Sequence, residues 1–86
     1  MTLVRAAPAT VHGTAFRGHE RVRVVLRRPG RAAAVREVTA SAGGAFSVAF
    51  RGTAVDRCAG FSLSARGGFG SRAAVRRVPR TACPPA

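Results

Sequence analysis

Six amino-acid types are missing from this 86-residue chain: lysine, asparagine, glutamine, isoleucine, tyrosine and tryptophan. Acidic residues are nearly missing too, because Glu20, Glu37 and Asp56 stand against 15 arginines and leave a net charge of +12. No apolar run approaches the roughly 20 residues of a membrane helix, and residues 1–13 show no signal-peptide pattern. The length allows one domain, and a hydrophobic content of 47% excludes a disordered basic tail.

The residues that catalysis and metal binding require are few and unsuitably spaced. His12 and His19 lie seven positions apart, unlike the close histidine or cysteine pairs of zinc sites. No G-x-S-x-G nucleophile elbow occurs, and the three carboxylates are scattered. Segment 68–73 matches the relaxed dinucleotide pattern G-x-G-x-x-A, but Pro79 cuts short the helix that this pattern requires. We therefore expect a protein that is not an enzyme and that holds no cofactor and no metal.

Cys58 and Cys83 predict a disulfide bond. A domain this small has a marginal core, and closing a loop of about 25 residues stabilises it by about 3.5 kcal/mol in the chain-entropy model. A disulfide indicates an oxidising compartment, so we expect an extracellular or cell-surface protein whose signal peptide lies upstream of this chain, or a module excised from one. The alternative is a pair of reduced thiols in a cytosolic protein.

Alternation of apolar and polar residues predicts an all-β, antiparallel fold. Strands are expected at residues 11–16, 21–27, 33–40, 46–50, 54–55, 61–65 and from residue 73 onward. Short strands every 8–12 residues, separated by Gly or Pro turns, are typical of a sandwich or barrel. Residues 1–9 have no period and predict a disordered leader, residues 10–83 a single domain, and residues 84–86 a tail.

The segments 33–40 and 46–50 are predicted to form a hairpin. A three-residue loop, residues 42–44, pairs Val38 with Val48 and keeps one face of the hairpin apolar. Gly44 then takes the left-handed conformation of a G1 bulge.

A second hairpin is predicted around the glycines at positions 67, 68 and 70. Pairing Ala65 with Ala73 places Phe69 at the tip, between Arg66 and Arg72. Binding loops often lie at such tips, so these three residues are a candidate binding site, in which an exposed Phe is flanked by cations. The alternative is a loop residue that folds back onto the domain.

Several segments resemble the bacterial immunoglobulin-like modules of secreted and surface proteins from high-GC bacteria. Those modules often read V-x-G-x-x-F-x-P-G-E-x-V-x-V-x-L, followed by T-A-D-x-x-G-x-F. The matching segments here are Val11–Phe16, Glu20–Leu26, Val38–Ala40 and Gly44–Val48, and residues 58–73 resemble the closing hairpin. The resemblance implies an immunoglobulin-like sandwich of six or seven strands and a non-catalytic module. The sequence departs from the pattern at Gly18-His19 and at Ser41, where the family prefers Pro-Gly and Asp.

The predicted function is therefore that of an extracellular structural or adhesive module, and the alternative is a small basic nucleic-acid-binding protein. An isoelectric point near 12 is the electrostatic signature of a nucleic-acid binder, and Arg66-Gly67-Gly68 is one RGG triplet. However, single-strand binders stack bases on aromatic side chains, and Tyr and Trp are absent. Acidic cell-wall polymers, anionic surfaces or another domain of the same protein suit the charge equally well. The arginines fall in most segments, as expected of a solvated polar face.

Overall fold

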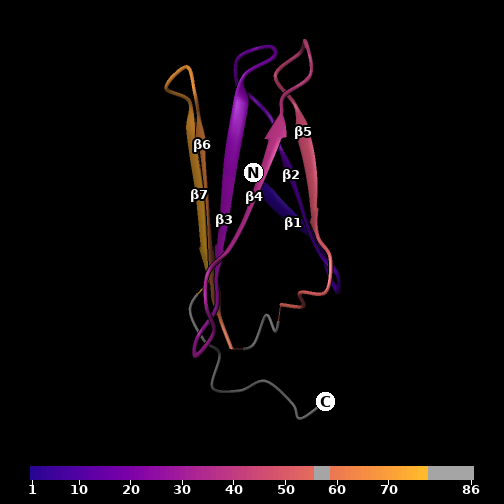
Figure 1. Ribbon diagram of the computed structural model, residues 1–86, viewed down its shortest axis with the longest axis vertical. Coiled ribbons are helices and arrows are strands. Elements are labelled where there is room, and N and C mark those ends of the chain that lie inside the picture. The colour runs from indigo at the N-terminus through magenta and orange to yellow at the C-terminus, as the bar shows by residue number, and fades with distance from the viewer. Residues whose placement is uncertain (56–58, 78–86) are drawn as a thin grey trace.

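The computed structural model describes residues 1–55 and 59–77. These residues form seven antiparallel strands in two sheets (Figure 1). The described residues contain no helix, and so no helix that could cross a membrane. The strands are β1 (Thr2–Ala6), β2 (Ala9–Gly13), β3 (Arg21–Arg27), β4 (Ala34–Thr39), β5 (Phe46–Phe50), β6 (Phe61–Gly67) and β7 (Arg72–Arg77). Residues 56–58 and 78–86 lie outside the described residues. The predicted Cys58–Cys83 disulfide and the tail at 84–86 fall there.

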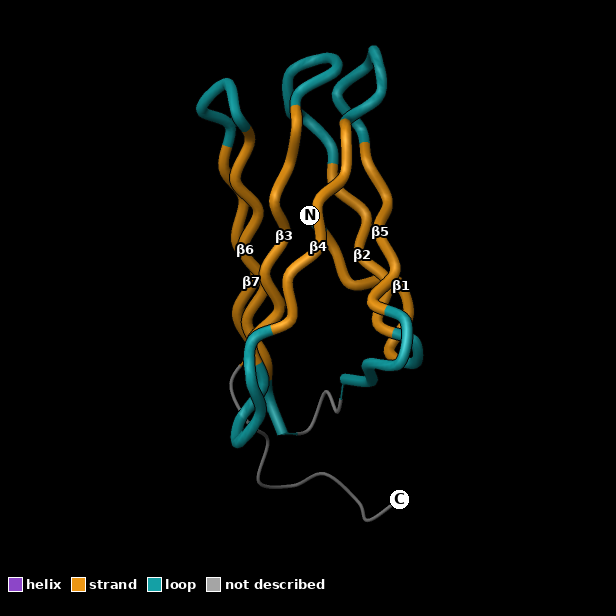
Figure 2. Tube along the Cα trace, in the orientation of Figure 1, coloured by secondary structure: helices purple, strands orange, loops and turns teal. Residues whose placement is uncertain are grey.

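One sheet has the strand order β1-β2-β5 and the other β4-β3-β6-β7 (Figures 1 and 2). The buried side chains of both sheets form one apolar core between them. Its members are Leu3, Ala9, Val11, Phe16, Val22, Val24, Leu26, Ala40, Phe46, Phe50, Val55, Phe61, Leu63 and Ala65. The period-two alternation directs the strand residues of this set inward and leaves polar residues on the outer faces, and Phe16, Ala40 and Val55 join the core from loops.

The predicted hairpin of residues 33–40 with 46–50 is wrong. Val38 pairs with Val22 of β3, whereas Val48 pairs with Val11 of β2, so β4 and β5 belong to different sheets. Both valines still face the core, because the apolar side of each strand is covered by the opposite sheet rather than by a hairpin partner.

The loop between β4 and β5 has the predicted conformation even though the strands do not pair. The Ser41 amide donates to the Ala45 carbonyl at 2.8 Å, the Gly44 amide donates to the Ser41 carbonyl at 2.9 Å, and Gly44 has a φ of +81°. Only glycine adopts this φ without strain. The tight turn therefore carries the chain from one sheet to the other.

The disordered leader predicted for residues 1–9 is also wrong, because this segment contains β1. Leu3 is 8% exposed and pairs with Val11 in the middle of β2. Strand β2 begins earlier than predicted and ends at Gly13, so that Phe16 enters the core from a loop. Residues 54 and 55 form no strand.

The predicted second hairpin is confirmed as β6 and β7. Ala65 pairs with Ala73, and Leu63 pairs with Val75. Strand β6 also pairs with β3, which places the hairpin beside the arginine-rich strand.

Candidate polyanion-binding face

The outward-facing side of the four-stranded sheet carries a concentration of cations, and we call it the arginine face. Directly paired residues of neighbouring strands lie on the same side of a sheet, so the register identifies which side chains share it. Six exposed arginines share this face: Arg21, Arg23, Arg27, Arg66, Arg72 and Arg76.

Three of these arginines form a row across three adjacent strands. Arg23 pairs with Arg66, and Arg66 pairs with Arg72. Neighbouring strands are about 4.8 Å apart, and like charges placed directly opposite destabilise a sheet. The row therefore adds like-charge repulsion to the folded state, and an anion bound along it would offset that repulsion.

A second, sparser row lies further along the same strands. It contains Arg27 and Arg76, with Ser62 paired to both between them. The two rows are four residues apart along a strand, or about 13 Å.

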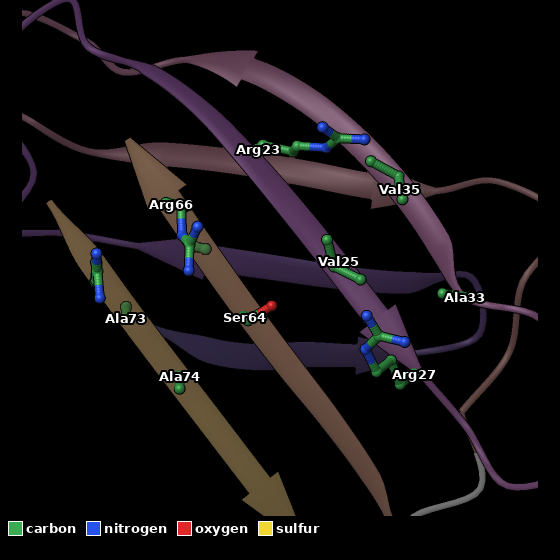
Figure 3. A pocket seen from close by; sticks show the side chains of 11 residues that line it. Arg23, Val25, Arg27, Ala33, Val35, Ser64, Arg66, Ala73 and Ala74 are labelled. Atoms are coloured by element: carbon green, nitrogen blue, oxygen red, sulfur yellow. The ribbon is translucent and has the colours of Figure 1, made fainter. Parts of the chain in front are cut away.

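A strip of small and apolar side chains separates the two rows, and it consists of Val35, Val25, Ser64 and Ala74. The strip forms the floor of a shallow hollow of about 720 Å³. Figure 3 shows Val25 and Val35 between Arg23 and Arg27. An elongated ligand lying across the strands in this hollow contacts arginines on both sides.

Glu37 is the one described acidic side chain on the arginine face. It pairs across the sheet with Arg23, and its carboxylate lies 3.4 Å from the Nε atom of Arg21. Both side chains of this ion pair are more than half exposed, so the pair contributes little to stability. Arg66, Arg72 and Arg76 lie on β6 and β7, farther from Glu37 than Arg21 and Arg23 are, so this side of the arginine face keeps its positive potential.

The structure brings together the three residues of the predicted binding tip. Arg66 and Arg72 are a cross-strand pair at the base of the β6–β7 turn, and Phe69 projects from the turn with 59% of its surface exposed. The alternative, in which Phe69 folds back onto the domain, is wrong. The two histidines are exposed and separate, and no group of three or more potential metal ligands gathers among residues 1–55 and 59–77.

Beneath this tip lies Glu20, the one charged residue buried in the described part of the chain. Its carboxylate accepts hydrogen bonds from the amides of Arg17 at 3.0 Å, Phe69 at 2.7 Å and Ser71 at 3.2 Å. Gly67 leaves room for it, because a Cβ there would collide with the carboxylate. Glu20 thus fastens the β2–β3 loop to the β6–β7 turn.

The surroundings of Glu20 set the direction of its pKa shift. Burial alone raises the pKa of this carboxyl, but the Ser71 hydroxyl and the three amides lower it, and the net pKa is below the ordinary value of 4.5. The folded state therefore binds a proton less readily than the unfolded state does. Glu20 contributes stability above about pH 4.5 that is lost as the pH falls through its folded-state pKa.

We expect Glu20→Gln to lower the melting temperature at pH 7 by about 10 °C or more, because the buried amides lose a charged acceptor. The gap between the two proteins should narrow as the pH falls below 4.5, since the wild-type carboxylate becomes protonated. Circular dichroism melts of both proteins between pH 3 and 7 measure this gap. A gap that stays constant over this range would contradict the assigned role of Glu20.

Sequence reasoning missed the arginine face and the role of Glu20. The alternation in residues 21–27 indicates that Arg21, Arg23 and Arg27 share one side of a strand, but nothing local shows that this strand lies beside β6. Glu20 lies in one of the segments that resemble bacterial immunoglobulin-like modules, but the Phe69 and Ser71 amides that bind its carboxylate lie about 50 positions away. No family model, curated protein or solved structure matched this chain.

Proposed function

We propose that this chain is a non-catalytic, immunoglobulin-like binding module of a secreted or cell-surface protein, and that its arginine face binds an acidic polymer. The strand order supports the immunoglobulin-like assignment: β3, β6 and β7 stand as strands C, F and G do in that fold, and β1, β2 and β5 stand as A, B and E. The segments that resemble bacterial immunoglobulin-like modules support it as well.

The row Arg23, Arg66 and Arg72 is the observation that carries the proposed binding role. Three arginines at directly paired positions bring like charges onto neighbouring strands, and an anion that binds among them offsets that repulsion. The second row, containing Arg27 and Arg76, extends the positive potential across the hollow.

The floor of the hollow favours a polymer without bases over a nucleic acid. Val25, Val35 and Ala74 offer an apolar surface for an uncharged sugar or glycerol backbone, while the rows of arginines pair with its anionic groups. Sheet proteins that bind single-stranded nucleic acid stack bases on aromatic side chains, and no aromatic residue lines this hollow. An acidic cell-wall polymer meets both requirements.

Two triple variants of equal charge test the proposal. One replaces Arg23, Arg66 and Arg72 with glutamine, and the other replaces Arg5, Arg31 and Arg51, which are exposed and are not among the six arginines of the arginine face. Both lose three charges, so long-range attraction falls equally. We expect the face variant to bind fluorescently labelled poly(glycerol phosphate) about 3- to 150-fold more weakly than the other, at roughly 0.2–1 kcal/mol for each of the three lost arginine contacts.

Equal loss of affinity in the two variants would show that net charge alone attracts the polymer and would overturn the proposal. Single-stranded oligo-dT of matched length and charge provides a second comparison. We expect it to bind no more tightly than the base-free polymer at the same salt concentration. A preference for oligo-dT of more than about tenfold would instead assign the face to nucleic acid.

A further inference from the structure

Phe69 exposes a large apolar surface to water, which is unfavourable for a phenylalanine side chain. It is one of two large apolar side chains that the described residues expose, at 59%, and the other is Val4 of β1 at 57%. Phe69 stands between two glycines on the turn, which the Gly67 amide closes by donating to the Ser71 carbonyl at 2.7 Å. The aromatic ring therefore projects alone from a convex tip.

The buried carboxylate of Glu20 fixes the backbone from which this ring projects. It accepts the Phe69 amide at 2.7 Å and the Ser71 amide at 3.2 Å, and the Gly68 amide donates to the Arg21 carbonyl at 2.8 Å. A tip held at three points loses little conformational entropy on binding, and such preorganisation favours a contact role for the ring.

Cations surround the base of the same tip. Arg66 and Arg72 flank the turn, and the Arg21 backbone carbonyl accepts the Gly68 hydrogen bond. Of the two acidic side chains that the structure describes, Glu20 is buried below the turn and Glu37 on β4 is paired with Arg21, so Arg66 and Arg72 supply the positive charge at the tip. The tip therefore combines one apolar anchor with a positive collar.

We propose that the Phe69 tip docks onto an anionic lipid bilayer, with the ring inserted at the headgroup boundary and the arginines paired with lipid phosphates. A bilayer accepts a convex, isolated apolar group because it deforms around it, and its negative surface attracts basic residues. A soluble polymer offers no apolar interior to the ring. The inference goes beyond the polymer-binding face, and Phe69 itself does not line the hollow on that face.

The absence of tryptophan and tyrosine makes the test direct, because Phe69→Trp introduces a single reporter. The net charge attracts the protein to any anionic vesicle, so the readout must be insertion and not only binding. With vesicles of phosphatidylglycerol and phosphatidylcholine we expect a blue-shifted emission and protection from acrylamide quenching. Emission that stays water-like on vesicles that demonstrably carry the protein would overturn the proposal.

Truncation of the ring supplies the second measurement. We expect Phe69→Ala to weaken binding to these vesicles about tenfold, whereas the matched control Val4→Ala leaves it unchanged. Equal affinities for the two variants would also overturn the tip assignment. Phe69→Ala should still bind poly(glycerol phosphate) like the wild type, whereas the triple variant of the arginine face should not, so failures of the two proposals are distinguishable.

Discussion

Gly44→Ala is expected to lower the free energy of unfolding by about 2–5 kcal/mol, a large share of the stability of a domain this small. Two costs add. Gly44 has a φ of +81°, which alanine adopts only with strain, and an added Cβ would overlap the carbonyl of Phe16, which belongs to the backbone and cannot rotate away. Urea unfolding followed by circular dichroism measures the change.

Gly30→Ala is the matched control for this substitution. Gly30 also has a positive φ, +68°, but an added Cβ would meet nothing within 4 Å. It should therefore show the conformational cost alone, about 1–2 kcal/mol. Equal losses of stability in the two variants would contradict the proposal that Gly44 is required for close packing of the β4–β5 loop on the β2–β3 loop.

Phe46→Ala should cost about 3–5 kcal/mol and lower the melting temperature by at least about 15 °C. The Phe46 side chain is 4% exposed, and its ring meets that of Phe16 edge to face at a centroid distance of 5.0 Å. The ring also fills the space that a side chain on Gly13 would occupy. Truncation leaves a cavity beneath β2 that the backbone cannot close.

Phe69→Ala removes an identical side chain from the exposed tip. We expect it to change stability by less than about 0.5 kcal/mol, because the ring makes no core contact to lose. Thermal melts of the two variants, side by side, decide the point. A Phe69→Ala protein that melts as early as Phe46→Ala would place Phe69 in the core and contradict its assignment to the surface.

Local sequence patterns were sufficient to predict most strands and one complete register. Residues 21–27 and 46–50 alternate with period two, which is a property of the segment itself and survives in any β fold. The β6–β7 hairpin was predictable because its loop is short, so that turn geometry fixes the pairing of Ala65 with Ala73.

The partner of each strand was not predictable where the loop allows two outcomes. The turn around Gly44 has the same hydrogen bonds whether the chain continues as a hairpin or crosses to the opposite sheet. The apolar faces of β4 and β5 are buried whether the two strands form a hairpin or belong to opposite sheets, so the apolar pattern does not discriminate between the two arrangements. The choice between these arrangements depends on the pairing of the whole set of strands, in which β4 pairs with β3 and β5 pairs with β2.

The candidate site shows the same difference between features set by a local sequence pattern and features set by strand pairing. The tip of Arg66, Phe69 and Arg72 lies within one hairpin, so its position in the fold was predictable from the sequence. The arginine face joins β3 to β6 and β7, segments about 40 positions apart, and only their pairing shows that Arg23 stands beside Arg66. Six of the 15 arginines, which are dispersed along the chain, therefore share one face of the folded protein.

An NMR titration with poly(glycerol phosphate) tests the central claim most directly, because each arginine carries its own Nε–Hε resonance. The account predicts that the resonances of Arg23, Arg66 and Arg72 shift first and furthest, while those of Arg5 and Arg51, off the arginine face, stay nearly unchanged. Shifts of similar size for all arginines, or larger ones for Arg5 and Arg51, would contradict a binding site on this face.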